Sequence, residues 1–315
     1  MQALLDSKGG AGMKRKTKWM LTLAFVSLGL GLLLCGVGLA QMGFDFTKLN
    51  TEAYVENTYT VTDLFENICI DTDVADVRLL PTEGKECKIV CHETEKVTYA
   101  ITVENGTLRI ELQDARKWYE YIGIFFFGER SLTVYLPQTE LNSLQLTTDT
   151  ADVEVTKDFS FVSAQISTDT GDVSWYASTS KSLSISTDTG DVWVEMPEAG
   201  EVTLKTDTVR LRISSVSCQA LHAQSSTGDI SFTNVLVSGV LTAKCSTGDV
   251  RFVDTDAATI DVKTSTGDVT GTLLSEKHFV AKTSTGHVDV PKTTTGGNCE
   301  ITTSTGDIKI RISKS

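Results

Sequence analysis

Apolar and polar residues alternate along most of the chain after residue 65, and one recurring phrase cuts this alternation into segments. The phrase is a polar residue followed by Thr, Gly, Asp and then Val or Ile, as at 246–250. Its fourth position recurs every 19 or 20 residues, at 152, 172, 191, 210, 229, 249, 268, 287 and 307. A short fixed period of this kind is typical of a solenoid, in which each repeat forms one turn of a coil.

One repeat, residues 182–202, predicts the structure of each turn. Residues 182–187 alternate as a half-buried strand does, Gly190 permits a tight turn, and residues 192–196 alternate again before a second turn. A single repeat cannot bury its apolar face, whereas copies stacked about 4.8 Å apart bury it against one another. We therefore expect an all-β fold, a parallel β-helix of 19–20 residues per rung. Its handedness does not follow from these residues, but right-handed is the common form and the one we expect.

The same alternation predicts which side chains face inward. Two inward columns are apolar, and a third is mostly Thr, whose hydroxyls we expect to bond to one another along the stack. Cys245 falls in this Thr column and should be a buried thiol. Gly190, Gly228, Gly248 and Gly267 precede the Asp of their turns and should adopt positive φ.

Acidic residues flank the turns of four successive repeats. They are Asp149, Asp152, Asp169, Asp172, Asp188, Asp191 and Asp207. Like carboxylates about 4.8 Å apart repel by roughly 3 kcal/mol per neighbouring pair at a surface dielectric, before salt screening. In one interpretation, each Asp after the turn glycine accepts hydrogen bonds from turn N–H groups. In the other, the doubled-Asp rungs hold calcium, the one cofactor that the sequence suggests.

An uncharged run precedes the repeats. Residues 20–40 contain no charged side chain and are long enough, at roughly 31 Å, to cross a bilayer as a helix. Residues 1–40 hold five basic residues and one acidic residue, and this basic cluster should stay inside the cell. The run is longer than a signal peptide needs, and Leu34 before Cys35 does not fit a lipoprotein site. We expect a cytoplasmic tail at 1–18, a transmembrane helix at 19–40, a linker at 41–64 and an extracellular domain at 65–315.

The N-terminal part of that domain, residues 65–140, departs from the period, whereas 141–315 should form regular rungs. An early copy of the phrase stands at 71–77, and Asn105-Gly106 predicts a hairpin turn between 100–103 and 108–112. At the other end, Lys309, Arg311 and Lys314 should discourage strand addition to the last rung.

Residues 116–130 carry an aromatic cluster. Its members are Trp118, Tyr119, Tyr121, Phe125, Phe126 and Phe127. Such a cluster either contacts a partner or a membrane, or covers the first rungs as the cap that a solenoid needs for solubility.

Charge narrows the range of partners. The chain carries a net charge of −13, and because residues 1–40 carry +4, the remainder carries −17. This acidic balance argues against nucleic acid and is compatible with cations, cationic surfaces or neutral glycans. Six cysteines outside the membrane permit disulfides, whose pairing the sequence does not define.

These features together resemble a known bacterial family. The uncharged helix, the linker at 43–49, the phrase at 71–77, the segment 132–137 and the Thr-Gly-Asp-Val rungs are similar to membrane-anchored "putative adhesin" β-strand-repeat proteins, which include LiaG-like envelope proteins. The resemblance covers residues 14–315 and implies a β-solenoid on the outer face of the membrane. That family is of unknown function and supplies no catalytic residues.

Three classes of function remain open. A non-enzymatic surface module would bind an envelope polymer or glycan, whereas an envelope scaffold would bind a membrane protein. The third class is a glycan lyase, because some polysaccharide lyases are β-helices that use Asp-bound calcium and an Arg as the catalytic base. Here Arg210 lies in the Asp column between Asp191 and Asp229. The alternative role for Arg210 is to relieve like-charge repulsion in that column. We expect no enzymatic activity, because no Ser-His-Asp set, phosphate loop or zinc-type spacing occurs.

Overall fold

A computed structural model describes residues 15–45, 54–84, 86–121, 130–137 and 140–313. The chain divides into two units: residues 1–53 with 118–128, and residues 54–117 with 129–315. We describe each unit by itself.

The first unit contains helix α1 (Arg15–Gln41) and the short 3-10 helix η2 (Trp118–Tyr121). Within α1, Trp19–Gln41 has a mean hydropathy of 2.3 and is not buried against the rest of the protein. Among the described residues it is the one helix long and apolar enough to cross a membrane.

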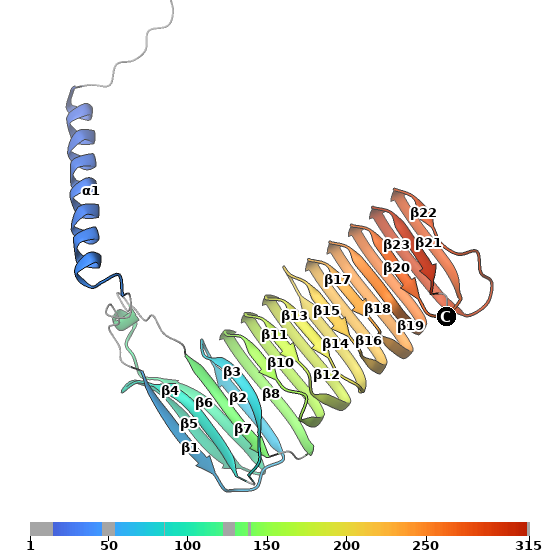
Figure 1. Cartoon of the computed structure of the whole chain (residues 1–315), viewed down its shortest axis with the longest axis horizontal. Coiled ribbons are helices and arrows are strands. Elements are labelled where there is room, and N and C mark those ends of the chain that lie inside the picture. The colour runs from blue at the N-terminus through green and yellow to red at the C-terminus, as the bar shows by residue number, and fades with distance from the viewer. Residues whose placement is uncertain (1–14, 46–53, 85, 122–129, 138–139, 314–315) are drawn as a thin grey trace, which may run out of the picture. The chain divides into compact units, whose positions relative to one another are not determined.

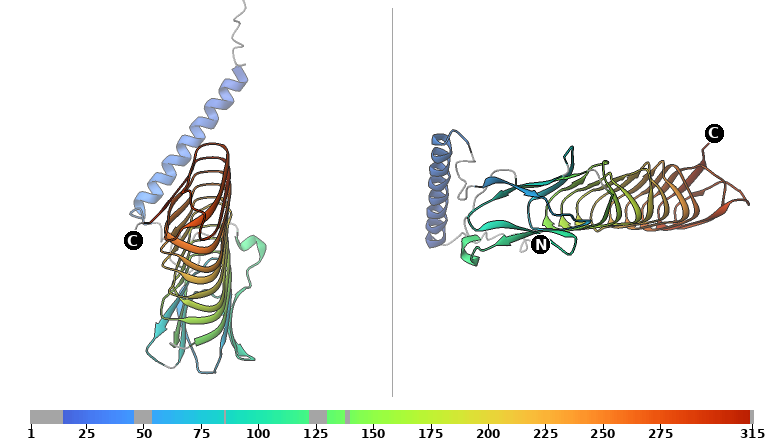
Figure 2. Two further views of the ribbon diagram at one scale, coloured as in Figure 1. Left: turned by 90° about the vertical axis from the view of Figure 1, so that its right-hand side faces the viewer. Right: turned by 90° about the horizontal axis from the view of Figure 1, so that it is seen from below.

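The second unit is the β-solenoid (Figure 1). Each rung contributes one long strand to a first parallel sheet and one short strand to a second, and Figure 2 shows the rungs from two further sides. The long strands are β8 (Glu140–Thr150), β10 (Ser160–Thr170), β12 (Ser178–Thr189), β14 (Ala199–Thr206), β16 (Ser217–Thr227) and β18 (Leu236–Thr247). The short strands are β9 (Val153–Val155), β11 (Val173–Trp175), β13 (Val192–Glu195), β15 (Leu211–Ser214) and β17 (Ile230–Thr233). Strand β19 (Val250–Thr266) runs through both sheets before β20 (Val269–Leu273).

The rungs at the C-terminal end do not stack in chain order. Strands β23 (Gly297–Thr305) and β24 (Ile308–Ile312) lie between the β19–β20 rung and the rung of β21 (Lys277–Thr285) and β22 (Val288–Asp289). Ile301 and Ile308 are therefore fully buried, whereas Val288 on the terminal rung is 42% exposed. The more apolar rung occupies the interior position, where burial stabilises it more.

This order corrects one prediction about the last edge. Lys309 and Arg311 lie on β24, which has a neighbour on each side, so they do not guard an open edge. Arg311 instead forms an ion pair with Asp289 of the terminal rung. Lys314 lies outside the described residues.

The N-terminal end shows the same kind of insertion. Strands β2 (Asn67–Thr72) and β3 (Asp76–Thr82), which flank the early copy of the phrase, pair with β8 and β9 on one side. On their other side they pair with β6 (Thr107–Asp114) and β7 (Ser131–Pro137). The early copy is thus one more rung of the regular stack.

Antiparallel strands close this end. Strand β5 (Val97–Glu104) forms the predicted hairpin with β6, and Asn105 and Gly106 adopt φ of 51° and 73°, which confirms the turn. Strand β4 (Cys87–Glu93) pairs with β7 and with β1 (Val55–Val61). Strand β1 falls inside the segment expected to be a linker, because its seven residues, VENTYTV, alternate too briefly to give a strong strand signal.

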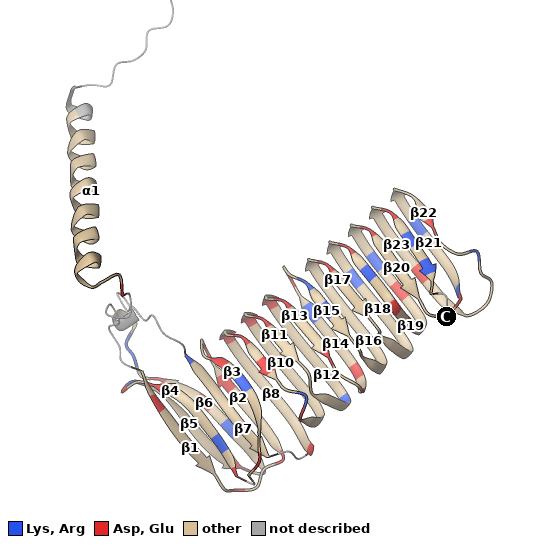
Figure 3. Ribbon diagram, viewed as in Figure 1, with Lys and Arg blue, Asp and Glu red and all other residues tan. Residues whose placement is uncertain are grey.

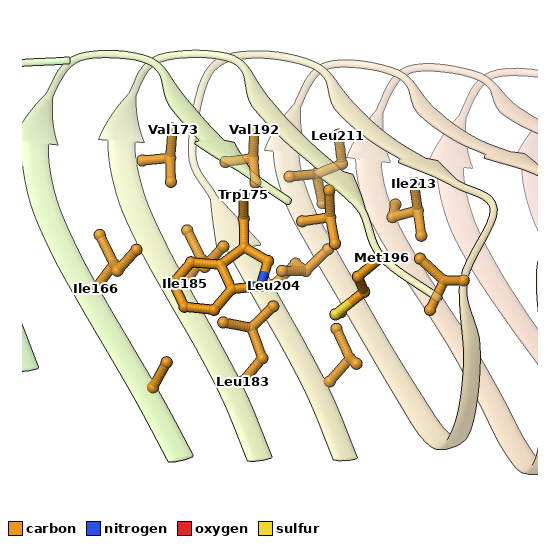
Figure 4. Close-up of a cluster of buried hydrophobic side chains, with 14 of the residues drawn as sticks. Ile166, Val173, Trp175, Leu183, Ile185, Val192, Met196, Leu204, Leu211 and Ile213 are labelled. Carbon is orange, nitrogen blue, oxygen red and sulfur yellow. The ribbon is translucent and has the colours of Figure 1, made fainter. Parts of the chain in front are cut away.

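The core lies between the two sheets along the whole stack. Side chains of both sheets meet around Trp175 (Figure 4), whose indole N–H donates to the Ala177 carbonyl at 2.7 Å. Further along, the rings of Phe232 and Phe252 stack with centroids 5.2 Å apart. The predicted inward columns are buried in every rung except the terminal one, where Ala281, Thr283 and Val288 are half-buried or exposed.

Candidate functional site

The turn after each long strand depends on its glycine. Gly190, Gly228, Gly248 and Gly267 have φ between 144° and 156°, as predicted. A Cβ on Gly267 would lie 2.0 Å from the Gly248 carbonyl oxygen, and one on Gly190 would lie 1.8 Å from that of Gly171. The glycines therefore serve both the backbone conformation and the close contact between successive turns.

Several inward hydroxyls of the Thr column bond to the carbonyls of turn glycines rather than to one another. Thr187 donates to the Gly171 carbonyl at 3.4 Å, and Thr303 donates to that of Gly267 at 3.2 Å. Cys245 is a buried thiol, as predicted, and contacts the Gly228 carbonyl oxygen at 3.3 Å. In several rungs the expected hydroxyl chain is thus replaced by a side-chain bond to a backbone carbonyl of the adjacent turn. One exception is Thr206, whose buried Oγ1 atom makes no hydrogen bond within the described part of the chain.

The aspartates after the turn glycines form a ladder along the solenoid. The Oδ1 atom of each accepts the backbone N–H of the equivalent residue in the adjacent rung, at 2.7–3.2 Å. The first series runs from Asp76 through Asp152, Asp172 and Asp191 to the N–H of Arg210. The second runs from Asp229 through Asp249, Asp268 and Asp307 to the N–H of His287. The Asp therefore bonds an N–H group, as one interpretation held, but that group belongs to the next rung.

Arg210 ends the first series because its side chain cannot accept the N–H of Asp229. Its guanidinium lies 3.0 Å from the Asp191 carboxylate, and Arg212 lies 3.2 Å from the same oxygen. Arg212 also lies over the ring of Trp193, 5.9 Å from its centroid. Arg210 thus offsets the repulsion at the end of a run of carboxylates, as the sequence suggested, and is occupied by an ion pair.

The outer acidic column extends one rung beyond the four repeats predicted from the sequence. The register places Thr72 opposite Thr148, so Asp73 and Asp76 of the early copy continue the columns of Asp149 and Asp152. Burial, together with the nearby Asp149, raises the pKa of Asp73 above its usual value. The phrase at 71–77 was the signal for these residues, but its place beside residue 149 depends on the inserted order of the rungs.

The aspartates of the calcium hypothesis line the turns as two rows rather than one cluster. Asp149, Asp169 and Asp188 are exposed, and Asp207 accepts a hydrogen bond from Ser226 at 3.2 Å. Within the described part of the chain, no three His, Cys, Asp or Glu side chains converge as a metal site would require. Calcium binding by these rows stays a prediction, and the ladder gives the second row a role that needs no metal.

The aromatic segment lies in the first unit. On η2, Trp118 is 77% exposed and Tyr119 is 50% exposed, with their ring centroids 5.9 Å apart. The side chain of Tyr121, and the residues Phe125, Phe126 and Phe127, lie outside what the structure describes. The choice between a cap and a partner contact therefore stays open for this segment.

Two grooves lie along the long strands. The larger, about 550 Å³, follows the second turn of the rungs and is lined by Cys218, Val237 and Ala257, with Glu198 and the pair of Asp256 and Lys277 among its other residues. Lys277 is buried, and its ammonium lies 2.5 Å from the Asp256 carboxylate. The smaller groove, about 270 Å³, lies beside Lys244 and Lys263.

The cysteines form no disulfide, and all seven are free. Burial raises the pKa of Cys87, Cys91 and Cys299 to about 12 and that of Cys218 to about 11. These thiols are protonated core residues at neutral pH rather than nucleophiles.

The period, the turn glycines and the two-sheet stack agree with one family model. The Toastrack DUF4097 model matches residues 65–271 and 239–315. The chain belongs to the Toastrack DUF4097 family. The family is one of unknown function, as the sequence resemblance implied.

Two solved structures with limited similarity to this chain come from Bacteroides fragilis and Parabacteroides distasonis. A "putative adhesin" from Bacteroides fragilis is 15% identical, with a TM-score of 0.42, over 83% of this chain and 98% of its own. A "putative lipid binding protein" from Parabacteroides distasonis is 10% identical, with a TM-score of 0.46, over 81% of this chain and 97% of its own. Similarities of this size carry no argument about the ligand of this Toastrack protein. No curated protein matches the chain.

Proposed function

We propose that this Toastrack protein is a non-enzymatic module, held on the outer face of the cell membrane by α1, whose solenoid binds an envelope polymer. The observation that carries the proposal is the set of exposed polar columns that repeat from rung to rung along the long-strand sheet. A linear polymer presents its groups at regular intervals, so a repeating surface can contact several of them at once.

Other features support the proposed function. The helix is flanked on its N-terminal side by Lys14, Arg15, Lys16 and Lys18, which favours a cytoplasmic N-terminus. Arg210, the one residue that suggested a lyase, is paired with Asp191. The net charge of −17 outside the first 40 residues disfavours nucleic acid as the partner, because a duplex needs a broad basic face rather than a single column of basic side chains.

Co-sedimentation tests the binding. The full chain in detergent micelles should pellet with isolated cell envelopes, and should still do so after the envelopes have been digested with trypsin to remove their proteins. If trypsin abolished the binding, the partner would be a membrane protein, and the scaffold function would replace the polymer-binding one. The exposed aromatic side chains of η2 favour that second candidate.

A separate experiment tests the proposed membrane topology. Protease added to intact cells should digest the solenoid and leave a membrane-bound fragment of about the first 40 residues. A solenoid that stays intact until the cells are lysed would overturn the proposed location.

A further inference from the structure

The register of the long strands places several lysines in one outward column. Lys205 pairs with Gln224, Gln224 with Lys244, and Lys244 with Lys263. Because β23 is inserted, Thr302 follows Lys263 and Lys282 comes last. We call these six positions the lysine column, and at about 4.8 Å per rung it is roughly 24 Å long.

Most of these lysines have no anionic partner. Lys263 lies 3.1 Å from the Asp261 carboxylate. Lys205, Lys244 and Lys282 are exposed and make no ion pair with any residue that the structure describes. Ammonium groups in one column repel one another, and an anion placed along the column would reduce that repulsion. The same anion would be attracted by several positive charges at once.

Hydroxyl groups lie beside the column. The smaller groove, about 270 Å³, has Lys244 and Lys263 on one side and Ser226, Ser246 and Ser265 on the other. Ser246 and Ser265 are exposed, and their side chains make no hydrogen bond within the described chain. The groove thus offers cationic and neutral donors together, which suits the oxygens of a phosphate or carboxylate group.

On the same face of the preceding rungs, other residues occupy the positions of the lysine and serine columns. The lysine column continues backward as Ser186, Ser167 and Thr147, while the serine column continues as Asp207, Asp188, Asp169 and Asp149. The charged residues in Figure 3 follow this division, with basic positions gathered toward the C-terminal rungs. Beside the lysine column, an anionic chain would meet serine hydroxyls in the later rungs, whereas in the earlier rungs it would meet aspartates and no lysine.

We propose that the outer face of β14, β16, β18, β19, β23 and β21 binds a linear polyanion along the solenoid axis. The lysines stand one or two rungs apart, about 4.8 or 9.6 Å, so a polymer with one charge per repeat unit of comparable length could place successive anions beside successive lysines. The inference rests on the proposed polymer-binding function and names the chemical class of the polymer.

Titration with two defined polymers tests this inference. The full chain, in nanodiscs of zwitterionic lipid, is titrated with poly(glycerol phosphate) and with polygalacturonate, which separate phosphate from carboxylate recognition. We expect at least one of them to bind, with an affinity that falls as salt rises. Lys244→Gln with Lys263→Gln should weaken that binding about tenfold or more and lower the salt dependence by about one to two units of slope.

A matched control uses two exposed lysines outside the column, Lys157 and Lys181. Lys157→Gln with Lys181→Gln removes the same charge and should leave the affinity within about twofold. Equal weakening by both double variants, or no binding of either polymer, would overturn the inference. If neither polymer binds while the full chain still sediments with trypsin-treated envelopes, the polyanion inference fails and the proposed function stands.

Discussion

The rungs on either side of Arg210 share one backbone but differ in the side chains that flank their turns. We call residues 140–207 the aspartate half and residues 217–312 the serine half. In the aspartate half, Asp occupies both outer positions of each turn, and the half contains 13 acidic and three basic residues. In the serine half, Ser replaces the first Asp, and there are ten acidic and eight basic residues.

The comparison shows which outer position of the turn is needed for the stacking of the rungs and which position can vary. The second Asp is present in both halves because it accepts the N–H of the next rung. The first position carries no such bond along the stack, so it can be Asp in one half and Ser in the other. We infer that the specificity of the solenoid lies in this position and in the neighbouring lysine column.

The largest expected effect concerns a position that both halves require. Gly267→Ala would place a Cβ 2.0 Å from the Gly248 carbonyl oxygen at a φ of 144°. We expect a loss of about 3 kcal/mol or more in the free energy of unfolding, because strain and displacement of the adjacent turn add together. Urea denaturation measures it. Gly84→Ala is the control, since its Cβ would lie 3.6 Å from the nearest atom, and it should change stability by less than about 0.5 kcal/mol. Equal effects at both sites would show that the turn stack does not limit stability.

The next effect concerns the ladder. Asp249→Ala removes the acceptor of the Asp268 N–H, which is bonded at 2.8 Å. We expect a loss of about 1–2 kcal/mol, as for a charge-assisted bond at a partly exposed site. Asp249→Asn should lose less, because its amide oxygen still accepts. Ser246→Ala, at the first position of the same turn, should be close to neutral by the same denaturation measurement. A costly Ser246→Ala would remove the distinction between the two positions.

The calcium hypothesis predicts that the two halves respond differently to the ion. If the doubled-Asp rungs bind calcium weakly, at about 0.1–1 mM, the melting temperature should rise in millimolar calcium. Asp169→Asn with Asp188→Asn should abolish the rise, whereas Asp249→Asn with Asp268→Asn should leave it. Calorimetry without heat or thermal shift at 10 mM calcium would leave the N–H ladder as the sole role of these aspartates.

The smallest effect is a pH dependence confined to the aspartate column. Burial and Asp149 raise the folded-state pKa of Asp73 above its unfolded value, so the charged form is disfavoured in the folded protein. The destabilisation is present above the folded pKa and disappears as the pH falls through it. Asp73→Asn should therefore raise the melting temperature at pH 7 by about 1 °C and not at pH 4. An equal gain at both pH values would point to a cause other than charge.

The sequence by itself determined the structure of the single repeat, the rung. The 19–20-residue period, the alternation and the turn glycines predicted a stack of strand–turn–strand rungs, with two apolar columns and one Thr column facing inward. These predictions succeed because they depend on local geometry: the period of two along a strand and the special φ of a turn glycine. The hairpin at Asn105-Gly106 was predictable for the same reason.

Only the tertiary structure decided which rungs are neighbours. Rungs of equal length and similar pattern can stack in more than one order, so the sequence does not show that β23 inserts before β21 or that β2 lies beside β8. That order brings Asp73 and Asp76 into the aspartate columns, and places Thr302 between Lys263 and Lys282. It also decides the partners of the ladder, since the N–H that each Asp accepts belongs to the adjacent rung. Long-range stacking is set by the burial of whole apolar rungs, which no local pattern records.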